Sequence, residues 1–69
     1  MPLSLESPVI WTSSTGNERL GRLCRISSET GRCCVMFAGL GCRRVREEDL
    51  RSSDDESAPA CDNDCRLGC

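Results

Sequence analysis

Short runs of apolar and β-branched residues, separated by turn residues, recur along this chain, a pattern that predicts short β-strands. The clearest alternation runs through residues 32–38, whose sequence is RCCVMFA. On an extended chain, successive side chains point to opposite sides. One side then carries Cys33, Val35 and Phe37, and the other carries Cys34, Met36 and Ala38. Both sets are apolar, so we expect this strand to be covered on both faces, as in the middle of a small barrel or at an interface.

Four further segments are rich in residues that favour strands, and turn residues separate them. They are residues 9–12, 20–26, 42–46 and 51–53. Residues 27–31 and 39–41 have the composition of tight turns. In the first of these turns, Gly31 suits the left-handed position of a hairpin loop. Gly21 interrupts the second strand, which indicates a bulge or a sharp bend there.

The stretch CRRVREEDLRSS, residues 42–53, admits three interpretations: a charged helix, a nucleic-acid patch, or the closing strands of something small. The turn signals at both flanks leave too little length for a stable helix. We therefore predict a strand, a single 3₁₀ turn over residues 47–50, and a last short strand. In this interpretation Val45 and Leu50 face the core, and the acidic residues mark the turn between them.

At the level of turn and core residues, the chain resembles the small Src-homology-3-like barrels of the Tudor and KOW kind. The residues that carry the resemblance are Gly21, Leu23, Gly31, Val35, Phe37, Gly39, Val45, Asp49 and Leu50, with Val9 and Trp11 in the first strand. The resemblance implies an all-β fold, a five-stranded barrel over residues 8–53. Closure of such a barrel removes most free strand edges.

The segments that flank the expected barrel are poor in apolar residues. Residues 1–7 are expected to form a short leader. Residues 54–69 are expected to form a flexible, disordered tail that is acidic and bears cysteines, because so few apolar side chains cannot offset the entropy of ordering it.

Charge is divided unevenly between the body and the tail. Residues 1–51 carry a net charge of +2 and residues 52–69 a net charge of −4, which together give the chain's −2. Every basic residue is arginine. The overall charge balance argues against strong non-specific binding to nucleic acid, and the body alone is only mildly basic.

The arginines nevertheless provide the best candidate for a binding site. The expected stripe comprises Arg22, Arg43, Arg44, Arg46 and Arg51, with Trp11 as the one plausible stacking platform. Its partner would be nucleic acid or a protein. Alternatively, these arginines are solvated strand faces, paired with Glu47, Glu48 and Asp49. The acidic tail is also expected to compete for the stripe in cis.

Catalysis is not expected. The chain has no histidine, which removes the usual general base and a common metal ligand. It also lacks a Ser/His/Asp set and a glycine-rich phosphate loop, and its cysteines have no histidine partner. Aromatic residues are limited to Trp11 and Phe37, too few for an aromatic cage or a proline-binding groove.

The seven cysteines are open to several interpretations. Cys24, Cys33 and Cys42 are expected to be small buried residues in strands. Cys61, Cys65 and Cys69 have the spacing C-x3-C-x3-C, and three thiolates of this kind suit a soft metal such as zinc. The preferred interpretation of the same three residues is incidental or redox-labile thiols in a disordered tail, and disulfides within the tail or between chains are a further alternative.

Three expectations concern the surroundings of the protein. Cys34 and Met36 are predicted to lie on an outer surface and to offer an interface for a homodimer. No apolar run approaches the roughly 20 residues of a membrane span, so no membrane is expected. The first residues lack the pattern of a signal peptide, which favours a reducing, cytoplasmic location.

The sequence thus predicts a small non-catalytic binding module that uses arginine-bearing strands. It is also compatible with a metal- or redox-responsive protein that acts through its tail, and with a secreted peptide stapled by disulfides.

Overall fold

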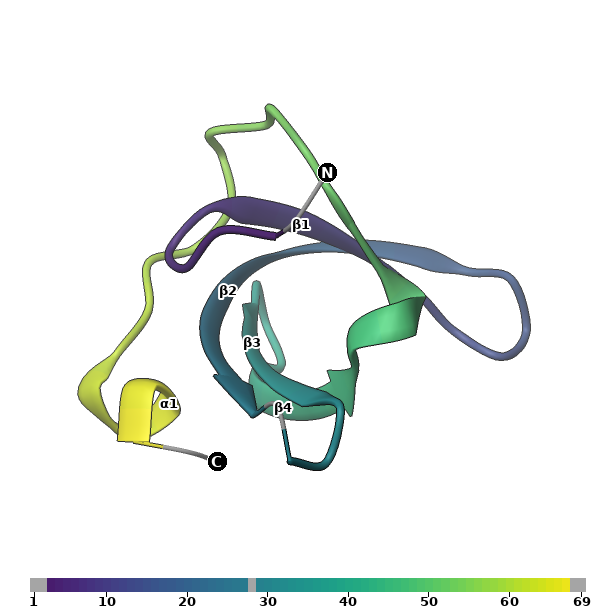
Figure 1. Ribbon diagram of the computed structural model, residues 1–69. Coiled ribbons are helices and arrows are strands. Elements are labelled where there is room, and N and C mark those ends of the chain that lie inside the picture. The colour runs from purple at the N-terminus through teal and green to yellow at the C-terminus, as the bar shows by residue number, and fades with distance from the viewer. Residues whose placement is uncertain (1–2, 28, 68–69) are drawn as a thin grey trace.

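The structure is a computed structural model that describes residues 3–27 and 29–67. Its strands are β1 (Pro8–Thr12), β2 (Glu18–Ser27), β3 (Arg32–Phe37), β4 (Gly41–Arg46) and β5 (Leu50–Ser52). A 3₁₀ helix, η1 (Glu47–Asp49), joins β4 to β5, and a short helix, α1 (Asn63–Leu67), lies near the C-terminus. The strands form one antiparallel sheet in the order β4-β3-β2-β1-β5, which curls round on itself (Figure 1). The all-β prediction and its strand positions agree with this sheet.

The sheet is open, in contrast to the closed barrel that was expected. Over the described residues, β4 and β5 are its two edges, and they do not pair with each other. The one turn of η1 carries the chain from one edge to the other, where Leu50 and the next two residues pair with β1. Only three residues are left for β5, and its ladder with β1 takes all of them.

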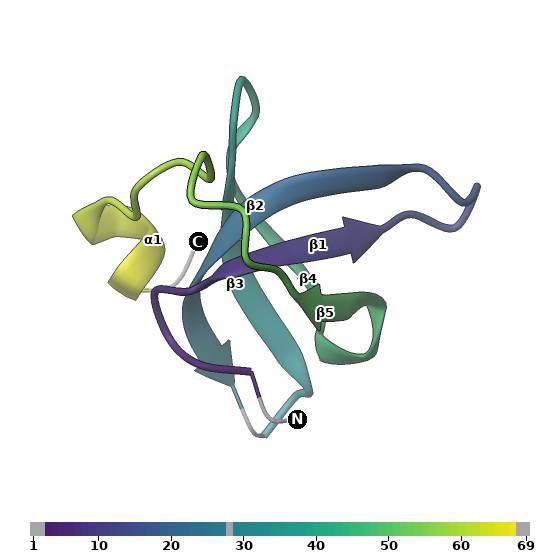
Figure 2. The ribbon, with the colours of Figure 1, turned by 90° about the horizontal axis from the view of Figure 1, so that it is seen from above.

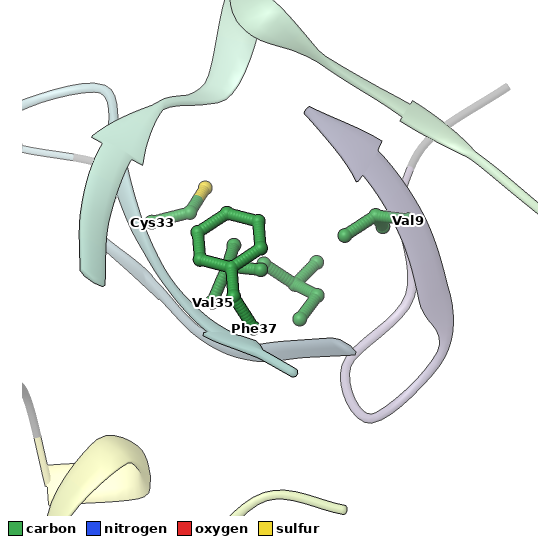
Figure 3. Packing of buried hydrophobic residues seen from close by; sticks show 5 residues of the cluster. Val9, Cys33, Val35 and Phe37 are labelled. Atoms are coloured by element: carbon green, nitrogen blue, oxygen red, sulfur yellow. The ribbon is translucent and has the colours of Figure 1, made fainter. Parts of the chain in front are cut away.

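The inner face of the curled sheet holds the main hydrophobic core. Its fully buried members are Val9, Leu23, Cys33, Val35 and Phe37. Figure 3 shows the labelled members pointing into the space that the strands enclose. Val45 and Leu50 pack against this cluster, as their positions on either side of η1 predicted. Burying one such aliphatic side chain contributes about 1.5–3 kcal/mol, so this cluster is the main source of stability for the sheet.

Two features shape the long strand β2. At Gly21, an added Cβ would lie 2.6 Å from a methyl group of Val35 and 2.8 Å from the carbonyl oxygen of Met36, so only glycine fits between β2 and β3. The bulge that was predicted near Gly21 lies instead at Cys24, because the register with β3 shifts between Leu23 and Arg25. Leu23 therefore points inward, while Cys24 is the extra residue and joins a cluster on the outer face.

The outer face of the sheet carries a second buried cluster, made largely of sulfur-containing side chains. It consists of Cys24, Cys34, Met36 and Cys65, with Cys42 and Cys61 packed against it. Helix α1 covers β2, β3 and β4 on this side, and Figure 2 places α1 and β5 on opposite sides of the molecule. The strand β3 is thus covered on both faces, as its alternation predicted.

The C-terminal segment, residues 53–67, is ordered, and the prediction of a disordered tail is not supported for these residues. Two disulfides fix it to the sheet: Cys61 bonds to Cys24 of β2, and Cys65 bonds to Cys42 of β4. Asp62 caps α1, since its carboxylate accepts a hydrogen bond from the backbone N–H of Cys65 at 2.8 Å. Two disulfides and a helix cap therefore stabilise a segment that has few apolar side chains to bury.

Candidate functional site

Strand register gathers four arginines on the outer face of the sheet. Arg25 of β2 lies opposite Cys34 of β3, which lies opposite Arg44 of β4. In the next row, Arg32 of β3 lies directly opposite Arg46 of β4. We call Arg25, Arg32, Arg44 and Arg46 the arginine face. Because directly opposed residues point to the same side, like charges there repel, and a bound anion would relieve that repulsion.

Three hollows border the arginine face. One, of about 410 Å³, is lined by Arg25, Ser27, Thr30, Arg32, Cys34 and Arg44. A second, of about 480 Å³, is lined by Thr30, Gly31, Arg32, Arg46, Glu47 and Glu48. The smallest of the three, of about 220 Å³, is lined by Trp11, Arg32, Arg44, Val45, Arg46 and Asp49. All three share Arg32, so guanidinium groups, hydroxyls, acidic side chains and one indole lie around this residue.

Acidic residues of η1 lie at one end of this surface. Arg46 forms an ion pair with Glu48 at 3.4 Å, and both side chains are largely exposed. An exposed pair of this kind contributes only about 0–1 kcal/mol, so a polyanion can displace the glutamate at little cost. The expected pairing of arginines with the acids of residues 47–49 is thus seen in this weak ion pair.

Three of the predicted site residues, Arg44, Arg46 and Trp11, do line a common hollow. Trp11 is half-buried, and its ring packs on Phe37 with the ring centres 5.8 Å apart at a tilt of 55°. Part of the indole therefore packs against the inner core, and the rest lines the hollow of about 220 Å³.

The other predicted arginines lie elsewhere. Arg22 donates hydrogen bonds to the carbonyl oxygens of Glu6, Ala58 and Pro59, at 2.7, 3.3 and 3.0 Å. Arg43 lies opposite Val35, on the other side of β4 from Arg44, and donates to the carbonyl oxygen of Cys42. Arg51 lies on β5, at the opposite edge of the sheet from β4, and forms an ion pair with Glu18 at 2.6 Å.

Arg25 and Arg32 are members of the arginine face that sequence reasoning missed. Arg32 shares the parity of Cys34 in the alternating strand, so its direction was readable. The direction of Arg25 depends on the bulge at Cys24, which the sequence does not mark.

The tail cysteines differ from their predicted roles. Cys61 and Cys65 are disulfide-bonded, with Cα–Cα distances of 5.7 and 5.6 Å to their partners. Cys69 lies outside the described residues. In the described part of the chain, no three cysteine, histidine or acidic side chains are grouped to hold a metal ion. A zinc site on these cysteines needs thiolates, so the expectation applies only to the reduced chain.

The strand cysteines also divide between roles. Cys24 and Cys42, expected as buried thiols, are disulfide partners. Cys33 is a buried core thiol, as expected, and burial raises its pKa, with smaller contributions from Glu47 and Cys34. Cys33 is thus held in the protonated, unreactive form.

The face predicted as a homodimer interface is already occupied. Cys34 and Met36 are 6% and 8% exposed, because the protein's own C-terminal segment packs over them. The apolar outward side of β3 signals a covered surface, but the cover is intramolecular.

Comparison with known proteins adds no identity. No protein family model matches the chain. No curated protein matches it either. Over the residues described, no helix has the length and apolar character needed to cross a membrane.

Proposed function

We propose that the protein is a small non-catalytic module that binds single-stranded nucleic acid through its arginine face. The observation that carries the proposal is the register of β3 with β4, which sets Arg32 directly opposite Arg46 and places Arg44 one row away. Guanidinium groups bind phosphate oxygens in a bidentate manner, and a row of them can follow a phosphate backbone.

Two further features favour a single strand over a compact anion. The hollows extend the basic surface from Arg25 to Arg46, and Trp11 borders one end. Single-stranded sites typically combine a basic groove with an aromatic side chain on which a base stacks. The hydroxyls of Ser27 and Thr30 add donors for phosphate or sugar oxygens.

We also propose that the sheet belongs to the Src-homology-3-like class. The strand order β4-β3-β2-β1-β5 and the 3₁₀ turn before the last strand support this assignment. Function does not follow from that class, so the binding proposal rests on the arginine face alone.

The location of the protein bears on how it works. Disulfides persist in oxidising environments and are rare in the cytosol. Two of them connect the C-terminal segment to the sheet. They favour an oxidising compartment over the cytoplasmic location that was expected from the sequence.

The test is fluorescence anisotropy with a labelled oligothymidylate across a series of salt concentrations. The double variant Arg32→Ser/Arg44→Ser should bind about tenfold more weakly at low salt. Its slope of log affinity against log salt should fall by about 1.4, the value for two lost phosphate contacts on a single strand. The matched control, Arg43→Ser/Arg51→Ser, removes two charges outside the arginine face and should keep most of the affinity and the slope.

Two results would contradict the proposal. Equal losses in both double variants would mean that net charge alone drives binding. Tighter binding of a polyglutamate chain than of oligothymidylate would replace nucleic acid with an acidic protein partner.

A further inference from the structure

The C-terminal segment is held to the sheet mainly by its disulfides. Cys61 is bonded to β2 and Cys65 to β4, so the bonds span the outer face. Non-covalent contacts add to them: Arg22 donates to the carbonyl oxygens of Ala58 and Pro59, an ion pair joins Arg66 to Glu6, and Cys65 packs in the outer cluster. Among the described residues from 53 onward, only Ala58 and Cys65 are buried.

The same segment carries five acidic residues, and in the docked form the carboxylates of two of them accept local hydrogen bonds. Ser53 donates to the carbonyl oxygen of Pro8, which directs the acidic run 54–56 over β1 (Figure 1). In the sheet, β1 is separated from β4 by β2 and β3. The carboxylate of Asp55 accepts two hydrogen bonds from Ser57, and that of Asp62 caps α1.

One contact links this segment directly to the arginine face. The guanidinium of Arg25 donates to the carbonyl oxygen of Arg66, at the end of α1, at 3.5 Å. The docked helix therefore borders the hollow that Arg25 lines, while the side chains of Arg32, Arg44 and Arg46 are exposed.

We propose that the two disulfides act as a redox clamp: they fix the C-terminal segment beside the arginine face, where it contacts Arg25, and their reduction frees its acidic residues to reach the other arginines and to compete with nucleic acid in cis. This inference rests on the proposed function of the arginine face. In each reduction, one S–S bond takes two electrons and two protons from a dithiol and becomes two thiols. The dithiol is oxidised to its own disulfide.

The sheet can keep its fold when the clamp opens. None of the residues of the inner cluster, or of those packed against it, belongs to residues 53–67. A segment with so few apolar residues has little to hold it once the covalent bonds are lost. Residues 52–69 carry a net charge of −4. Tethered at β5, they would face the arginines at an effective concentration in the millimolar range.

The test compares oligothymidylate affinity of the full-length protein before and after treatment with dithiothreitol, at low salt. Reduction should weaken binding about 3–10-fold, as expected for a weak competitor at that effective concentration. The matched control neutralises the acids other than Asp62, as Asp54→Asn/Asp55→Asn/Glu56→Gln/Asp64→Asn, and keeps Asp62 as the cap of α1. Its affinity should not respond to reduction.

Each other outcome has a defined meaning. If neither form binds oligothymidylate, the proposed function fails; if the oxidised form binds and reduction leaves the affinity unchanged or raises it, only the clamp fails. Circular dichroism and the amide spectrum of the reduced protein should retain the sheet, and their loss would overturn the clamp. Zinc titration adds a further readout, because stoichiometric uptake that restores the oxidised affinity would mean that metal, rather than disulfide exchange, controls the segment.

Discussion

The two faces of β3 are both buried, but they are buried in different ways. The inner face packs on Val9 and Leu23, which come from neighbouring strands of the same sheet. The outer face packs on Cys65 and its neighbours, from a segment more than 20 residues away, and two disulfides hold the contact.

The difference shows that the two faces of one sheet can be stabilised in different ways, one by the burial of apolar side chains and the other by covalent cross-links. The inner cluster is built from side chains whose transfer from water is favourable by itself. The outer cluster depends on two disulfides, which join cysteines 37 and 23 residues apart in the sequence. Such cross-links stabilise the fold mainly because they lower the conformational entropy of the unfolded chain. Substitutions that open a cavity should therefore destabilise the packing of the inner face, and reduction of the disulfides should destabilise the packing of the outer face.

The largest effect should come from opening a cavity in the inner face. Leu23 is fully buried, so Leu23→Ala should lower the free energy of unfolding by about 2–5 kcal/mol, with or without reductant. Urea unfolding followed by circular dichroism measures this. The control Leu40→Ala, at a side chain that is 42% exposed, should change stability by less than about 0.5 kcal/mol. Similar losses at both positions would contradict the assignment of the core.

Removal of one disulfide should have a smaller and more local effect. The Cys42→Ala/Cys65→Ala variant should lose up to about 3 kcal/mol, the entropic value for a loop of this length. Hydrogen exchange should rise in α1, while amides at the centre of β2 and β3 stay protected. Equal loss of protection in α1 and in β3 would show that the two faces are not independent.

The smallest effect concerns Cys33, whose pKa burial raises above the ordinary value of 9.0. The folded state then favours the protonated thiol. This contribution to stability is complete below pH 9 and is lost as the pH rises through the higher pKa of the folded state. The midpoint of urea unfolding should therefore fall more steeply above pH 9 than in a Cys33→Ala variant. Parallel pH profiles for the two proteins would contradict the burial argument.

Local pattern was sufficient for much of the fold. The strands, the 3₁₀ turn at residues 47–49 and the inward direction of Val45 and Leu50 agree with the structure. These features depend on neighbouring residues, through alternation and turn composition. Closure of the sheet and the order of the C-terminal segment did not agree. Both depend on contacts between distant residues, and no local pattern encodes which cysteines pair.

The candidate site, like the fold, was predictable only as far as local sequence pattern determines it. Arg44 and Arg46 could be placed on β4, but their neighbours across the sheet depend on register. In a regular strand, Arg25 would share the side of Leu23 and point into the core. The bulge reverses the parity of β2 after Cys24, so Arg25 joins the outer face instead.

That bulge also bears on how such a protein can change over time. Cys24 is an extra residue relative to β3, so the ladder on either side pairs without it. Deletion of a single codon would leave a regular strand with the same inward residues and would remove one of the two covalent attachments of the C-terminal segment. The attachment is therefore a separable trait, because one deletion removes it while the inward-facing residues of β2 stay the same.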